Sequence, residues 1–181
     1  MILFILLGGG LSLVLGVFVE GARMWATNQQ ASVFLYHGVG CALVFALHQW
    51  RGLLLSILIS LMLAGIYGFT MGPYFVQVFI TSAVALLAMV FTGEFMWGKT
   101  FLRALFGRFL YVGLVLAVAA MLSTIVLALA YGEYLFSEVL VNNIIRGGLI
   151  GVGLGFGFEL AELITGRSRR RAALATRGSE S

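Results

Sequence analysis

The residues best suited to chemistry are polar side chains at the start of the last apolar stretch. Arg146 lies about five residues into that stretch, beside Asn142 and Asn143, with Glu138 two helical turns earlier on the same face. Ionisable residues at membrane depth are functional candidates by default. These four residues are therefore our candidate binding site for an anionic group or a partner carboxylate. The alternative, which the shallow depth favours, is that Arg146 reaches back to the membrane surface and only anchors its helix.

Histidine, cysteine and glutamate offer further candidates, each with a simpler structural interpretation. His37 and His48 are about three turns apart on one helix, roughly 16 Å, so they cannot ligate one haem together. His37 is expected to hydrogen-bond a neighbouring helix. Cys41, the only cysteine, lies one turn from His37, but these two residues alone are weak evidence for a metal site. Glu159 and Glu162 could relay a proton, but neutralising the basic residues after them is simpler. We therefore expect no metal and no cofactor.

Catalytic motifs are absent from the sequence. It contains no aspartate, so the aspartate-rich Mg²⁺ sites used for prenyl or phospho-alcohol transfer are excluded. No GxSxG, HExxH or P-loop pattern occurs either. We therefore expect no catalytic residues, and the sequence favours a protein that is not an enzyme.

The composition requires lipid as the solvent for most of the chain. Of the 181 residues, 61% are hydrophobic and 10% are charged, and the mean hydropathy is +1.08. Soluble domains carry about 25% charged residues. The apolar residues fall in runs of about 18 to 24, the length that a helix needs to cross hydrocarbon. The sequence therefore predicts an all-α, polytopic integral membrane helix bundle.

Six apolar runs define the expected transmembrane domain, residues 1–166, which a basic cytoplasmic tail, 167–181, follows. We retain the first run as a span, because it lacks the basic start of a cleaved signal peptide. Residues 97–108 carry bulky apolar side chains at helical spacing, which predicts a short interfacial helix or an extension of the fifth span. The expected spans are 2–19, 32–47, 53–70, 74–92, 109–130 and 141–164.

The basic residues indicate how the bundle is inserted. With six spans, nine of the eleven Lys and Arg residues fall on one side, which should be cytoplasmic because translocating positive charge is disfavoured. Both termini are then cytoplasmic, in a plasma membrane, most simply the inner membrane of a bacterium. Insertion topology also explains the net charge of +4, so we expect no nucleic-acid partner. The expected partners are the lipid bilayer and other membrane subunits or further copies of the chain.

Glycines recur at helical spacing in the last span, where six occur in eleven residues. Small residues four apart form a stripe that lets another helix backbone approach closely. We therefore predict helix packing, and a narrow backbone-lined path for a small solute is the alternative. The main stripe is Asn143, Gly147, Gly151, Gly155 and Glu159, and Gly153 with Gly157 forms a second ridge beside it.

Shorter rows of small residues occur in two other spans. The first span contains a row formed by Gly8, Ser12, Gly16 and Glu20, and we expect its glycines to pack against another helix. The third span contains a row formed by Ser56, Ser60, Ala64 and Gly68. Serines in such rows usually hydrogen-bond to their own helix. The sequence predicts that the first, third and sixth spans meet in the bundle core.

These observations favour a non-enzymatic membrane protein that acts as a subunit or assembly partner of a larger membrane complex. Its short loops leave little soluble polypeptide to do chemistry. The first alternative is a small solute or ion transporter, or the substrate-binding membrane subunit of one, with a site near Arg146 open to the outside. The second, least favoured because no catalytic constellation is visible, is an enzyme acting on lipid or quinone.

Overall fold

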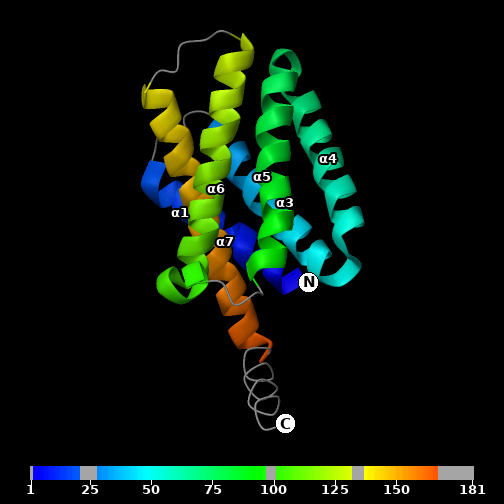
Figure 1. Cartoon of the computed structure of the whole chain (residues 1–181), viewed down its shortest axis with the longest axis vertical. Helices are drawn as coiled ribbons and strands as arrows, with labels where there is room; N and C mark the ends of the chain where they lie inside the picture. The colour runs from blue at the N-terminus through cyan, green and yellow to red at the C-terminus, as the bar shows by residue number, and fades with distance from the viewer. Residues whose placement is uncertain (1, 21–27, 97–100, 132–136, 167–181) are drawn as a thin grey trace.

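The protein is all-α in a computed structural model, which describes residues 2–20, 28–96, 101–131 and 137–166. Within these residues the chain forms six α-helices and one short 3₁₀ turn (Figure 1). The elements are α1 (Ile2–Glu20), α3 (Asn28–Arg51), α4 (Leu53–Thr70), η1 (Gly72–Tyr74), α5 (Phe75–Met96), α6 (Phe101–Tyr131) and α7 (Ser137–Ile164).

Four apolar stretches of the described chain are helical and long enough to cross a membrane. They are Leu53–Thr70, Gly72–Thr92, Phe109–Tyr131 and Val139–Ile164, the shortest of which has 18 residues. At 1.5 Å per residue, 18 helical residues span about 27 Å, close to the thickness of a hydrocarbon core. A shorter apolar helix covers Ile2–Gly16. These helices indicate a membrane protein built as a helix bundle.

Helix α3 lies at the centre of the bundle, where it contacts α1, α4, α5 and α7. Helix α7 packs against α6 and α1 as well. Figure 1 shows that α1 begins and α7 ends at the lower end of the bundle, whereas the turn between α4 and α5 lies at the upper end. The cavity described below lies between α3 and its neighbours.

The glycines of α7 bring its backbone against α6. A Cβ at Gly147 would lie 2.5 Å from the carbonyl oxygen of Leu116. A Cβ at Gly151 would meet the carbonyl oxygen of Val112 and lie 2.7 Å from the Cα of Gly113. Real Cβ atoms do not approach other atoms so closely, so a side chain at either glycine requires the two helices to move apart.

A second row of α7 glycines contacts α1 in the same way. A Cβ at Gly153 would lie 2.5 Å from the Cα of Ser12, and one at Gly157 would lie 2.5 Å from the Cα of Gly8. The hydroxyl of Ser12 donates a hydrogen bond across the interface to the carbonyl oxygen of Ile150, at 2.9 Å. This serine therefore bonds to a neighbouring helix, although serines in such rows usually bond to their own. Two further glycines of these rows, Gly16 and Gly155, are buried.

The expectation that the first, third and sixth spans meet is wrong for the third span. Among the described residues, α4 contacts α3, α5 and η1, but neither α1 nor α7. Its small residues are buried, so they pack against α3 and α5. Ser56 and Ser60 donate hydrogen bonds to Gly52 and Ser56 of their own chain segment, at 2.9 and 2.7 Å. A row of small residues thus identifies a buried face, but it does not identify the helix that covers that face.

A sharp kink at Gly107 divides α6. Gly107 has φ 69° and ψ 167°, which are not helical values, so residues 101–106 form a separate helical piece before the long apolar helix. L-amino acids with a side chain rarely adopt this positive φ. The kink lies in segment 97–108, for which the sequence predicts an interfacial helix or an extension of the fifth span. Residues 97–100 of this segment are outside the described residues.

Candidate functional site

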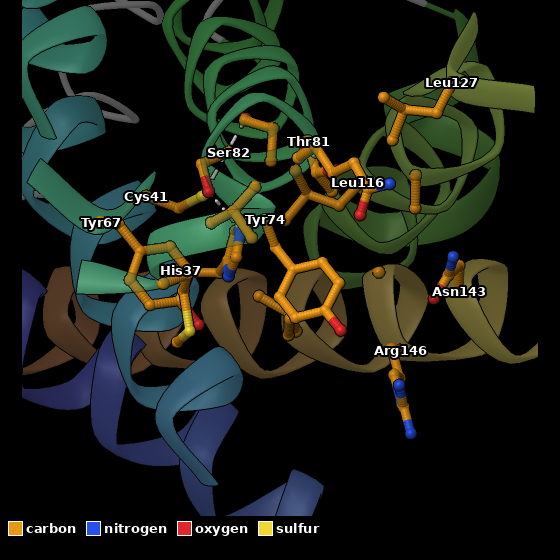
Figure 2. Close-up of a pocket in the computed structure, with 17 residues that line it drawn as sticks. His37, Cys41, Tyr67, Tyr74, Thr81, Ser82, Leu116, Leu127, Asn143 and Arg146 are labelled. Atoms are coloured by element: carbon orange, nitrogen blue, oxygen red, sulfur yellow. Dashed lines mark hydrogen bonds between the residues drawn. The ribbon is translucent and has the colours of Figure 1, made fainter. Parts of the chain in front are cut away.

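A cavity of about 470 Å³ lies among five helices, α3 to α7. Its volume is within the range of about 300–1,000 Å³ that is typical of small-molecule sites. Polar groups enter it from α3, α4, η1, α5 and α7 (Figure 2). From the first four elements these are His37, Tyr67, Tyr74, Gln77, Thr81 and Ser82, and α7 adds Asn143 and Arg146.

A histidine, a serine and a tyrosine form the buried end of the cavity, which is called its inner end below. The hydroxyl oxygen of Ser82 lies 3.1 Å from Nε2 of His37, at hydrogen-bonding distance. The ring of Tyr67 meets the imidazole edge to face, with centroids 5.6 Å apart and planes at 84°. Tyr67 also stacks on Tyr36, at 4.0 Å and 15°. These contacts hold the histidine ring from two helices, and His37, Tyr67 and Ser82 are all buried.

Helical periodicity explains why these side chains share one cavity. Residues four apart lie on the same face of a helix. His37 and Cys41 are so related on α3, and both line the cavity. Gln77, Thr81 and Ala85 form an equivalent row on α5.

Apolar side chains complete the wall, and most of the remaining surface is hydrocarbon. Small-molecule sites usually combine such an apolar lining with a few polar groups that set the orientation of the ligand. The cavity has this composition. The apolar lining residues include Val78, Leu116, Ala120, Leu127 and Ile150.

The structure brings only part of the candidate site near Arg146 to the cavity. Asn143 and Arg146 line it, and the side-chain amide of Asn143 donates a hydrogen bond to Oγ1 of Thr124, at 3.1 Å. In Figure 2 the Arg146 side chain points away from His37 and Ser82, so its guanidinium lies at the edge of the site. Asn142 is exposed on α7 and is not among the lining residues. The side chain of Glu138 is outside the described part of the structure.

The other candidate functional residues from the sequence do not line the cavity. His48, on α3, is not a lining residue, so the two histidines belong to different places in the bundle. Glu162 is buried, with 3% of its surface exposed, and Glu159 is half-buried. The basic residues that Glu159 and Glu162 were expected to neutralise lie in 167–181, outside the described residues. Among the described residues no group of three or more His, Cys, Asp or Glu could hold a metal ion.

The α5 residues of the cavity and the tyrosines Tyr67 and Tyr74 were not predicted from the sequence. Gln77, Thr81 and Ser82 are polar residues in an apolar run, but single Thr and Ser residues are common in membrane helices, where they bond to their own backbone. Thr81 does this, because its hydroxyl donates to the main-chain oxygen of Gln77 at 2.8 Å. The signal that could have identified the cavity wall is Gln77 itself. A glutamine within an apolar run needs a polar partner, a cavity or a ligand.

Comparison of the chain with protein-family models, with curated proteins and with solved structures finds no match. The geometry and chemistry of the cavity are therefore the basis for inferring a function.

Proposed function

We propose that this protein binds a small organic solute in the cavity among α3 to α7, as a transporter or as the substrate-binding membrane subunit of one. The observation that carries the proposal is the convergence of polar side chains from four helices and η1 on one largely apolar cavity. Placing a polar group within the membrane is unfavourable in free energy unless the group pairs with another or faces a cavity. Their arrangement around an open volume of ligand size supports binding rather than helix packing alone.

The proposed orientation places the cavity in the outer half of the membrane. We infer six spans with both termini in the cytoplasm of a bacterial cell, and the supporting observation is the distribution of Lys and Arg along the sequence. Arg146 lies nine residues after the start of α7 at Ser137. Tyr74 is the last residue of η1, the turn between α4 and α5, which lies at the end of the bundle opposite the start of α1 (Figure 1). In this orientation the solute enters from the outside.

The proposed solute binding is compatible with the role of a subunit in a larger membrane complex. The described connections within 28–96 are short, since one residue separates α3 from α4 and the 3₁₀ turn joins α4 to α5. Little polypeptide in this region is available outside the bundle to couple transport to an energy source. A partner protein would supply that coupling, and purification in mild detergent should recover it in fixed stoichiometry.

Thiol labelling tests access to the cavity directly. Cys41 is the only cysteine, so Cys41→Ala gives a cysteine-free background. In this background Thr81→Cys, on the cavity wall, should react with a membrane-impermeant thiol reagent added from outside. Leu114→Cys, half-exposed on the outer surface of α6, is the control and should not react in lipid. If neither cysteine reacts, or both react equally, the proposal of an accessible solute site is wrong.

A hydrolase is the second candidate, because Ser82 and His37 have the spacing of a nucleophile and its general base. His37 Nε2 would take the Ser82 proton as Oγ forms a bond to an ester carbonyl, and the alcohol would leave with that proton. Water would then release the acid. A fluorophosphonate probe should label the protein at Ser82, and Ser82→Ala should prevent the labelling. Absence of labelling, with stable folded protein, excludes this candidate.

A further inference from the structure

The chemistry of the cavity also indicates the class of solute, an inference that rests on the proposed binding function. Of the described residues that line the cavity, Arg146 alone is charged, and its side chain points away from His37 and Ser82 (Figure 2). None of the described residues in the lining carries a carboxylate. His37 and Ser82 are buried, so a charged group that entered beside them without a counter-charge would lose its hydration at a large cost in free energy. The inner cavity is therefore suited to an uncharged group.

The polar groups inside the cavity are neutral groups that can both donate and accept hydrogen bonds. The amide of Gln77 presents a carbonyl oxygen and two N–H groups, and it matches the edge of a second amide or of a nitrogen heterocycle. The hydroxyl of Thr81 is already directed to the main-chain oxygen of Gln77. Asn143 uses one N–H for Thr124, which keeps its carbonyl oxygen for a donor. Gln77 and Asn143 thus offer amide groups from two helices.

The aromatic side chains that line the cavity favour a ligand with a flat ring. Tyr67, Tyr74 and His37 all line the cavity, and Figure 2 shows the Tyr74 ring between His37 and the α7 residues Asn143 and Arg146. Aromatic side chains bind planar ligands through offset-stacked and edge-to-face contacts. Apolar residues from α5, α6 and α7 form the rest of the wall.

We propose that the solute is an uncharged planar ring compound that carries an amide or an equivalent donor–acceptor edge, with that edge bound by Gln77. The ring lies among the aromatic side chains, and the amide faces α5. The site discriminates against cations, for which its described lining residues provide no carboxylate. It also discriminates against purely apolar rings, which leave the Gln77 amide without a hydrogen-bonding partner.

A series of four probes with one ring system tests this assignment. The probes are 2-naphthamide, 2-naphthoate, 2-naphthylmethylammonium and 2-ethylnaphthalene, which differ in charge and hydrogen bonding but little in size. Binding to the full chain in mild detergent is measured by calorimetry. The amide should bind most tightly, by roughly tenfold over the apolar probe, because one or two hydrogen bonds are worth about that factor.

Two glutamine variants identify the group responsible. Gln77→Leu should abolish the preference for the amide over the apolar probe. Gln49→Leu, on α3 and not among the residues that line the cavity, should leave the preference intact. An amide preference that survives Gln77→Leu would overturn the role of Gln77.

The outcomes separate this inference from the proposed function. Tightest binding of naphthoate, lost in Arg146→Gln, would assign the site to organic acids, and the inference would be wrong while solute binding stands. Tightest binding of the ammonium probe, or no binding of any probe by a protein whose Thr81→Cys reacts from outside, would also refute the assignment and leave the binding site in place. If Thr81→Cys is unreactive and no probe binds, both proposals are wrong.

Discussion

Ser82 on α5 and His37 on α3 lie with Oγ and Nε2 3.1 Å apart at the inner end of the cavity. Their positions in the chain are 45 residues apart, so this hydrogen bond joins two helices and also fixes the orientation of an imidazole that faces the cavity. The serine hydroxyl can donate or accept, so the pair can form with either neutral tautomer of His37.

Removing the serine hydroxyl should destabilise the protein. Ser82→Ala leaves Nε2 of a buried histidine without this partner, and we expect a loss of about 1–2 kcal/mol in the free energy of unfolding. Thr81→Ala is the control, because the Thr81 hydroxyl bonds to its own helix, and it should have a smaller effect. Thermal melting in detergent measures both. Equal losses would show that the bond between α3 and α5 contributes nothing specific.

A methyl group at Gly151 should disrupt the contact between α6 and α7. Its Cβ would meet the backbone of Val112 and Gly113, and overpacking of this kind typically costs about 1–3 kcal/mol. Gly65→Ala, on α4, is the matched control because its Cβ would have nothing within 4 Å. It should be neutral or slightly stabilising, since alanine favours helix over glycine. A melting temperature that is unchanged in Gly151→Ala would contradict the close approach of these backbones.

The hydrogen bond between Ser12 and Ile150 should stabilise the contact between α1 and α7. Ser12→Ala is expected to lower stability by roughly 0.6 kcal/mol, the average for hydrogen bonds between membrane helices. Ser60→Ala is the comparison, because Ser60 is also fully buried but bonds to the main chain of its own helix. Chemical unfolding in mixed micelles measures the difference. If the two variants are equally stable, the hydrogen bond between the helices makes no net contribution to the free energy of unfolding.

Reporter fusions test the proposed orientation. Fusions at Gly72 and Gly132 should report the outside, and a fusion after Arg171 should report the inside, because most basic residues then remain cytoplasmic. A compartment-specific pair, such as alkaline phosphatase and a fluorescent protein, gives opposite signals for each site. An external signal at the C-terminus would refute the six-span topology.

The sequence by itself determines the all-α class and the membrane as solvent. Both follow from local properties, namely the length of each apolar run and the near absence of charge within it. The same local reasoning identified small-residue rows on α1, α4 and α7, since residues four apart share a face whatever lies opposite. It also singled out Asn143, Arg146, His37 and Cys41 by residue type, without showing that they line one cavity.

Only the tertiary structure decided which helices meet and what they enclose. The row on α4 lies against α3 and α5 rather than α1 and α7, because the same small side chains allow close packing with any neighbour. Ser12 and Ile150 are 138 residues apart, and no periodicity relates positions on different helices. The cavity arises from the positions of α3 to α7 together, so the roles of Gln77 and Ser82 became visible only when the helices were placed side by side.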